Sequence, residues 1–270
     1  MTKQTAPAAI PDVQSFADSR HIAIDKVGVK NVSFPLTLRT REGGTQSTVA
    51  SINMYVALPH HQKGTHMSRF LEVLNEYARP LSPDCIGVVA GAIRERLEAA
   101  QAHLEIRFPY FIEKKAPVTA MPGLMDYQVT FSVDTNSETD LCMAVKAPAT
   151  SLCPCSKEIS AYGAHNQRCE IEANIRMNDT VWIEDLAEMC ERAASAPVYP
   201  VLKRPDEKFV TEQAFDHPKF VEDIVRDLAI ILDADDRIDW YSINSENYES
   251  IHNHNAYAQI TRDKREKSGR

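Results

Sequence analysis

Apolar and polar residues alternate along four stretches in the first half of the chain. The apolar positions fall at every second residue over 32–38 and 52–58, and a Gly-Gly pair lies between these two stretches. The same spacing returns over 104–110 and 127–133. A period of two is typical of β-strands that bury one face, so four strands are predicted, the first two joined as a hairpin.

Two helices are predicted between the second and third strands. Apolar residues over 70–77 are spaced for one face of a helix, which Pro80 ends. Ser82 provides an N-cap for the second helix, with a proline at its first position and an apolar face over 86–97. The first half therefore has the order ββααββ.

The second half repeats this order with a weaker pattern. Strands are predicted over 141–145, 169–175, 238–243 and 256–260, and helices over 183–194 and 221–232. The fold class is therefore α+β, with two tandem ββααββ modules, each an antiparallel sheet with two helices on one face. Such sheets leave open edges, and association into a β-barrel is one way to pair them.

These patterns also set the expected domain boundaries. We expect a mobile N-terminal tail over 1–22, a first module over 23–135, a second over 136–262 and a basic C-terminal tail over 263–270.

Composition narrows the class of protein. The 270 residues include 30 Lys and Arg against 38 Asp and Glu, a net charge of −8, which argues against general nucleic-acid binding. The longest apolar run, 86–93, is far shorter than the roughly 20 residues that cross a bilayer. The N-terminal residues contain no apolar leader segment, so we expect a cytoplasmic protein whose thiols stay reduced.

The segment 151–168 carries the densest chemistry. Cys153, Cys155 and His165 offer soft and borderline ligands or a nucleophilic thiolate in the connection between two predicted strands. The spacing fits no standard zinc finger, so a catalytic site, a structural metal site and ordinary loop thiols all stay open. The other cysteines lie on predicted helices or strands and are expected in the core: Cys85, Cys142, Cys169 and Cys190.

Three further positions in the second half are weaker candidates. Glu222 lies at the margin of an apolar helix face, and its carboxylate could accept two parallel N–H bonds of the kind that guanine and pterin offer. A solvated surface glutamate is the plainer interpretation. Glu207 falls in a predicted polar loop, and His252 and His254 fall in a loop between the last two strands.

In the first module, residues 63–70 join the second strand to the first helix. Lys63, His66 and Arg69, together with a glycine and hydroxyl groups at a helix N-terminus, suit a phosphate-bearing ligand. Helix capping plus ordinary surface charge explains the same residues equally well.

Taken together, the segments 63–70, 151–157, 163–168 and 217–223 resemble GTP cyclohydrolase of the bacterial type IB family. The resemblance spans nearly the whole chain outside the tails. It implies the tunnelling fold, in which ββααββ modules associate into barrels, and a homotetramer. It also implies an activity, in which GTP and water give 7,8-dihydroneopterin triphosphate and formate at the entry to folate synthesis.

The resemblance assigns a metal centre. It implies that Cys153 is the catalytic thiolate and a ligand, and that His165 and Glu207 complete the set around zinc or manganese. A metal held in this way would lower the pKa of bound water and supply the hydroxide that attacks C8 of guanine.

The resemblance also assigns substrate contacts. Glu222 would anchor the guanine edge, and His252 is a less certain participant. Apart from the resemblance, the reaction needs an acid/base, for which His252 and His66 are the candidates. Lys63 and Arg69, with Arg168 as a further candidate, are the cations expected to bind the triphosphate.

Two other functions compete with this one. The NADPH-dependent nitrile reductase of the queuosine pathway also has a Cys-Pro cysteine and a helix glutamate, although Cys155 and residues 163–168 favour the cyclohydrolase. The second is a non-catalytic purine- or pterin-binding protein with a structural metal.

Overall fold

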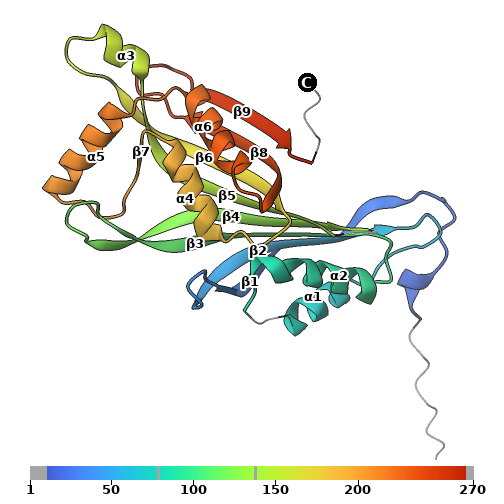
Figure 1. Ribbon diagram of the computed structural model, residues 1–270. Coiled ribbons are helices and arrows are strands. Elements are labelled where there is room, and N and C mark those ends of the chain that lie inside the picture. Colours follow the sequence, from blue (N-terminus) through green and yellow to red (C-terminus); the bar gives the residue numbers. More distant parts are fainter. Residues whose placement is uncertain (1–10, 78–79, 137–138, 266–270) are drawn as a thin grey trace, which may run out of the picture.

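A single antiparallel sheet forms the frame of the molecule (Figure 1). The computed structural model describes residues 11–77, 80–136 and 139–265. Within these residues the strand order is β1-β2-β3-β4-β5-β6-β8-β9, with the short β7 paired to β5. The strands are β1 (Ile24–Arg39), β2 (Thr45–Leu58), β3 (Ala102–Lys115), β4 (Pro122–Thr135), β5 (Thr139–Leu152), β6 (Asn166–Met177), β7 (Ala196–Pro197), β8 (Ile238–Asn247) and β9 (Ala256–Asp263).

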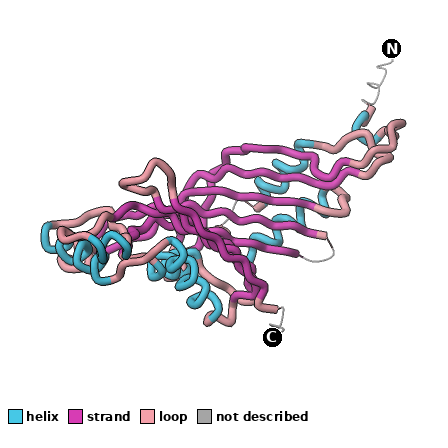
Figure 2. Tube along the Cα trace, turned by 90° about the horizontal axis from the view of Figure 1, so that it is seen from above, coloured by secondary structure: helices cyan, strands magenta, loops and turns pink. Residues whose placement is uncertain are grey.

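Helices pack on this sheet in both halves of the chain. They are α1 (Met67–Glu76), α2 (Ile86–Arg96), α3 (Pro154–Ile159), α4 (Ile183–Ala193), α5 (Arg204–Asp216) and α6 (Val221–Asp233), with 3-10 turns at Val13–Ser15 and Pro83–Cys85. The helix α2 contacts β3, β4 and β5, α4 contacts β5 and β6, and α6 contacts β8 and β9. Figure 2 shows the strands of the first half side by side as a broad sheet that twists into the second half, as right-handed strand twist requires.

The alternating apolar residues form one continuous core. Leu104 pairs with Val133 and Ile106 with Phe131 across β3 and β4, and all four side chains are buried against the helices. The same core continues into β5 and β6, because β4 pairs with β5 directly across the boundary expected at residue 135. The predicted α+β class, with antiparallel strands and helices on one face, is confirmed.

The pattern of turns and caps explains the element boundaries. The predicted hairpin turns at Gly43, whose φ of +83° is a conformation that glycine adopts without strain. Ser82 is the N-cap of the 3-10 turn Pro83–Cys85 that leads into α2, and the Cys85 Sγ accepts a hydrogen bond from the Ser82 backbone N–H at 3.0 Å.

Residues 204–216 differ from the sequence-based expectation. Residues 205–208, predicted as a polar loop around Glu207, form the beginning of the helix α5. Its Asp206 accepts hydrogen bonds from the backbone N–H of Val118, Thr119 and Lys203. Burial alone would raise the pKa of Asp206, but these bonds and that of the Thr119 hydroxyl lower it. Helix capping and the tie to the β3–β4 turn therefore stabilise a helix whose own apolar spacing is weak.

Only parts of the two expected tails are described, since residues 1–10 and 266–270 lie outside the described ranges. Gln14 and Phe16 accept backbone hydrogen bonds from Gly64 and Lys63, so this stretch packs on the loop after β2 rather than standing free. At the other end, the Lys264 ammonium donates to two backbone carbonyls at the end of α6 and just after it. Among the helices in the described part of the chain, none is long and apolar enough to span a membrane.

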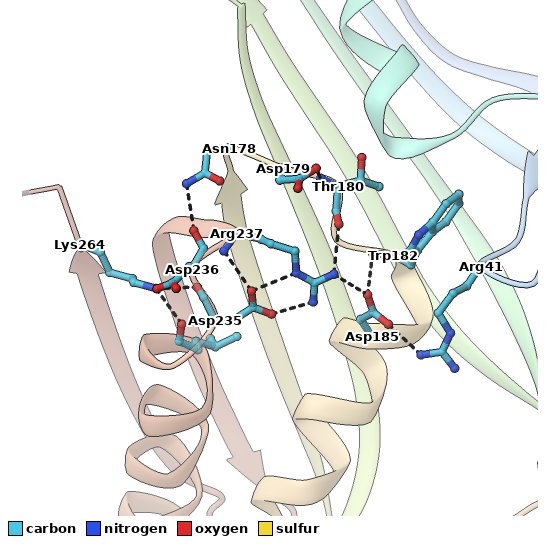
Figure 3. A network of polar contacts seen from close by, with 11 residues as sticks. Arg41, Asn178, Asp179, Thr180, Trp182, Asp185, Asp235, Asp236, Arg237 and Lys264 are labelled. Atoms are coloured by element: carbon cyan, nitrogen blue, oxygen red, sulfur yellow. Dashed lines mark hydrogen bonds and ion pairs between the residues drawn. The ribbon is translucent and has the colours of Figure 1, made fainter.

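A polar network fixes α4 relative to both halves of the sheet (Figure 3). Arg237, just before β8, binds Asp235 and also reaches Asp185 in the first turn of α4 at 3.1 Å. Arg41, in the β1–β2 turn, binds the other oxygen of Asp185 at 2.7 Å. Although burial would raise the pKa of Asp185, the two guanidinium groups and the Trp182 N–H lower it. Asp185 thus joins the first and second halves of the chain.

Candidate active site

The end of β5 places Cys153 at a helix N-terminus. Cys153 is the N-cap of α3, and its Sγ accepts a hydrogen bond from the Ser156 backbone N–H at 3.4 Å. Pro154 occupies the first helical position, where no N–H is needed, so the Cys-Pro sequence itself starts the helix. Cys153 is half-buried, whereas Cys155, the second residue of α3, is exposed. The thiol of Cys153 is therefore fixed in direction but accessible.

His165 lies directly beside Cys153. The Cys153 backbone N–H donates to the His165 carbonyl at 3.1 Å, where β5 meets β6. The His165 Nδ1 lies 3.0 Å from Gln167 Oε1 and 3.3 Å from Ser250 Oγ. Because an amide oxygen can only accept, Nδ1 donates to Gln167, and Nε2 keeps a free lone pair. This is the arrangement typical of metal-binding histidines.

A buried polar cluster supports these residues, and the sequence did not reveal it. Ser151, which is fully buried, accepts hydrogen bonds from Asn247 Nδ2 at 3.0 Å and Gln167 Nε2 at 3.5 Å. The Ser151 hydroxyl donates to the Lys219 carbonyl at 3.0 Å. The cluster joins β5, β6, β8 and the segment before α6, so it fixes Gln167 and through it the His165 ring. Polar residues inside strands break the apolar alternation, which is the one sequence feature that could have indicated them.

The same contacts bring Glu222 to this end of the sheet. The Lys219 backbone N–H donates to the Leu152 carbonyl at 3.0 Å, next to Cys153. Glu222 follows three residues later in the first turn of α6, where it is exposed.

His252 and His254 occupy the β8–β9 loop, which reaches His165 through Ser250. The two histidine rings are stacked with centroids 5.3 Å apart, and both residues are exposed. Four of the sequence-predicted residues, Cys153, His165, Glu222 and His252, thus lie on elements that meet at one end of the sheet.

Glu207 is a candidate of the second module that does not join them. It lies in the first turn of α5 and is exposed, whereas the contact of this helix with Leu152 is made by Ala214 near its other end. Seven residues of helix separate the two positions by about 10 Å. Within the described residues, no group of three or more His, Cys, Asp or Glu side chains converges to hold a metal ion. Cys153 and His165 fit a divalent metal by donor type and accessibility, but within one chain the third ligand is not in place.

The candidate phosphate-binding residues of the first module lie at the opposite end of the sheet. The start of β5 pairs with the end of β4, which pairs with the start of β3 and so with the end of β2. Residues 59–66 therefore lie at the end of β5 remote from Cys153, about 40 Å away at 3.3 Å per residue (Figure 1). There, His66 Nε2 lies 2.9 Å from Asp12 Oδ1, and Arg69 donates to the Arg96 carbonyl. One chain does not bring Lys63, His66 or Arg69 to the thiol.

The remaining cysteines behave as core residues to different degrees. Cys169 and Cys190 are buried, and burial raises the pKa of Cys169 to about 12. Cys142 is half-buried, and burial raises its pKa to about 11. Cys85 is half-buried in its cap. Cys169 is the nearest of the four to the candidate site, because it pairs with Ala149 of β5 and with Asn247 of β8, but its side chain is buried in the core.

Comparison with protein families identifies this arrangement. The family model described as type I GTP cyclohydrolase FolE2 matches residues 10–258 of this chain. The chain belongs to that family. GTP cyclohydrolase FolE2 of Magnetococcus marinus is 56% identical over 252 residues, covering 93% of this chain and 95% of the relative. The corresponding protein of Azoarcus sp. strain BH72 is 54% identical over 259 residues, covering 95% and 96%.

Solved structures add a likeness of fold. Uricase from Arthrobacter globiformis has a TM-score of 0.52 at 7% identity, over 91% of this chain and 96% of that one. A urate oxidase mutant from Bacillus sp. TB-90 also has a TM-score of 0.52, at 10% identity over 89% and 100%. At such identities the likeness shows the shared fold alone, and it confirms the tunnelling-fold expectation.

Membership of this family corrects the expected family label and decides between the three expected functions. The motifs were expected to mark the type IB family, but the matching model describes type I GTP cyclohydrolase FolE2, and that assignment replaces the type IB label. The nitrile reductase and the non-catalytic binding protein are set aside, because the family and both relatives are GTP cyclohydrolases.

Proposed function

We propose that this FolE2-family chain converts GTP and water to 7,8-dihydroneopterin triphosphate and formate for folate biosynthesis, at a site built around Cys153. The observation that carries the proposal is the pairing of Cys153 with His165, whose Nε2 is left open by the Gln167 hydrogen bond. The family match over residues 10–258 supplies the reaction.

Enzymes of this family generally depend on a metal. The Cys153 thiolate and His165 Nε2 are two of its ligands in this proposal, and Glu207 is the third. A mixed set of S, N and O donors suits zinc or manganese. When bound, the metal supplies Lewis acidity that makes hydroxide available near neutral pH.

The other residues bind substrate and move protons. The Glu222 carboxylate accepts the N1–H and the 2-amino group of guanine, a donor pair that adenine does not present. His252, in the loop that contacts His165 through Ser250, exchanges protons with the purine nitrogens during ring opening, because a neutral imidazole ring offers both a donor and an acceptor nitrogen.

The first-module residues serve this site only from another copy of the chain. Lys63 and Arg69 are about 40 Å from Cys153 along the sheet of their own chain. We therefore place them, with His66 as a second acid/base candidate, at the site of a neighbouring subunit, where the cations bind the triphosphate. The open edges at β1 and β9 provide the surfaces along which copies associate, and a homotetramer satisfies this arrangement.

Incubation of the purified protein with GTP tests the activity. The expected products are formate and, after oxidation, a fluorescent pterin. Chelator treatment should stop turnover, and added zinc or manganese should restore it. Full turnover by metal-free protein would refute the metal part of the proposal, and absence of pterin with either metal would refute the reaction.

Mixing two inactive variants tests the shared site. Cys153→Ala and Arg69→Ala chains, co-assembled from unfolded protein, should recover turnover, since some sites then combine an intact Cys153 with an intact Arg69. The same mixture of Cys153→Ala with His165→Ala should not recover, because those two residues belong to one chain. If the two mixtures recover turnover to the same extent, the proposal that two chains share one site is wrong.

A further inference from the structure

The N-terminal segment lies across the loop that joins β2 to α1. Residues 12–18 include the 3-10 turn Val13–Ser15 and run beside this loop, where Ala17 forms an antiparallel bridge with Gln62. Figure 1 shows this segment, in blue, at the end of the sheet remote from α3. We call residues 12–18 the strap.

The strap occupies backbone donors of the loop. The Lys63 backbone N–H donates to the Phe16 carbonyl at 3.0 Å. The Gly64 backbone N–H donates to the Gln14 carbonyl at 3.1 Å. These are two of the N–H groups that the sequence predicts for a phosphate-bearing ligand, so the strap and such a ligand compete for them.

Two carboxylates of the strap lie near side chains of the loop that can pair with an anion. Asp12 Oδ1 lies 2.9 Å from His66 Nε2. Hydrogen bonds from Arg20 hold the pKa of Asp18 well below its usual range, and the nearby Lys63 charge lowers it further. The strap therefore also competes with a phosphate for the positive charge of the loop.

The loop itself offers further donors that nothing occupies. Thr65 is only 9% exposed, and it is the one buried polar residue of the described part of the chain whose side chain makes no hydrogen bond. Its hydroxyl is not one of the polar atoms that are sealed from solvent. The helix α1 begins two residues later, with no side-chain cap and no acidic residue in its first turn. A ligand oxygen that enters here meets a free hydroxyl and the unpaired first N–H groups of a helix.

The strap can leave the loop without unfolding the sheet. Residues 11–17 are all exposed, including the apolar side chains of Val13 and Phe16. The strap thus buries little apolar surface and is held mainly by hydrogen bonds that water can reach. Segments held in this way open at a small cost in free energy.

We propose that the strap covers residues 63–66 in the free protein and is displaced when adjacent phosphate groups of a ligand bind there. The N–H groups of Lys63 and Gly64 then pass from strap carbonyls to phosphate oxygens, and the Thr65 hydroxyl donates beside them. Because only the open loop binds phosphate, the strap reduces the apparent affinity in proportion to the fraction of open molecules. The proposal rests on the proposed function in taking GTP as the source of the phosphates.

A disulfide between the strap and the loop tests the displacement. A Cβ atom at Gly64 would lie 3.8 Å from Gln14 Cβ, in ordinary contact. Disulfides join Cβ atoms about 3.5–4.5 Å apart, so the Gln14→Cys/Gly64→Cys variant should lock the strap when oxidised and release it when reduced. Gly64→Cys alone, treated with the same oxidant, controls for the native cysteines.

Calorimetric titration with inorganic triphosphate, without GTP or divalent metal, measures the effect of the lock. The reduced double variant should show saturable binding, and the oxidised one should bind about tenfold more weakly or not at all, because a locked strap keeps the loop closed. The affinity of the Gly64→Cys control should be the same before and after oxidation.

Two further measurements use the strap without a disulfide. The Asp18 backbone N–H donates to the His61 carbonyl at 3.0 Å, so its hydrogen exchange should become faster when triphosphate binds. Asp12→Ala should tighten triphosphate binding about two- to tenfold, the range that the net free energy of one hydrogen bond spans. Asp25→Ala removes an exposed carboxylate from the start of β1, beside the end of β2, and is the matched control for charge, with a smaller effect.

Four outcomes would overturn the proposal. They are no saturable binding at millimolar triphosphate, equal affinity of the oxidised and reduced double variant, exchange at Asp18 that does not become faster, and equal tightening by Asp12→Ala and Asp25→Ala. If the disulfide does not form, the exchange rates and the two alanine variants decide the question.

The GTP assay separates this proposal from the proposed function. Pterin formation from GTP together with equal triphosphate affinity of the oxidised and reduced double variant would refute the strap alone. Triphosphate binding that responds to the disulfide, in a protein that forms no pterin with either metal, would refute the reaction alone.

Discussion

Replacing Ser151 with alanine should destabilise the protein through the buried polar cluster beneath Cys153. The Ser151 hydroxyl accepts from Asn247 Nδ2 and donates to the Lys219 carbonyl, each at 3.0 Å, and Asn247 is only 3% exposed. Alanine leaves the buried Asn247 N–H unpaired, at a cost of about 1–3 kcal/mol, and removes a second bond worth about 1 kcal/mol. The free energy of unfolding should therefore fall by about 2–4 kcal/mol.

Urea unfolding followed by circular dichroism, at fixed protein concentration, measures this change. Ser242→Ala is the matched control, because Ser242 also bonds two side chains, Thr261 and Gln259, but on a solvent-accessible part of β8. Its loss should stay within about 0.5 kcal/mol, as for most surface changes. GTP turnover should also fall for Ser151→Ala alone, since Gln167 orients His165. If the two variants unfold at the same urea concentration, the cluster does not stabilise the site and the reasoning is wrong.

Three further changes test other parts of the structure. Cys153→Ala should abolish formate release while leaving the urea midpoint nearly unchanged, because the thiol lies on an accessible helix cap. Near-wild-type turnover of this variant with metal supplied would contradict a catalytic role for Cys153. Glu222→Gln should weaken GTP binding at least tenfold in equilibrium titration while ATP binding changes little, and equal GTP affinity in both proteins would return Glu222 to a surface role. Burial raises the pKa of Cys169 from 9.0 to about 12. Between these pH values the thiol of the unfolded protein loses its proton while that of the folded protein keeps it, so the free energy of unfolding falls as the pH rises. Cys169→Ala should reduce that fall by up to about 1.4 kcal/mol per pH unit in urea unfolding between pH 8 and 11, and an unchanged slope would show that the thiol does not contribute.

The sequence predicted most of the sheet and its main helices for a local reason. Residues at every second position of β3 and β4 face the same core, so the alternation of apolar and polar residues in the sequence directly indicates which side chains are buried. The helix α6 was found in the same way, through an apolar stripe that is buried in the structure. The helix α5 was missed because, among its apolar residues, only Val210 and Ala214 pack inward, while its capping depends on contacts with the distant β3–β4 turn.

For the candidate site, the sequence by itself determined which side chains carry chemistry and which family the chain resembles, apart from the subtype label. Cys153, His165, Glu222 and His252 stand out by residue type, and strand pairing then brings their elements to one end of the sheet. Only the tertiary structure placed the first-module cations at the opposite end of that sheet and left Glu207 on a separate helix turn. It alone also revealed the cluster around Ser151 and the contacts of the strap with residues 61–66. Local periodicity reports whether a side chain is buried, whereas the position of one element relative to another depends on strand register and on hydrogen bonds between residues far apart in the chain.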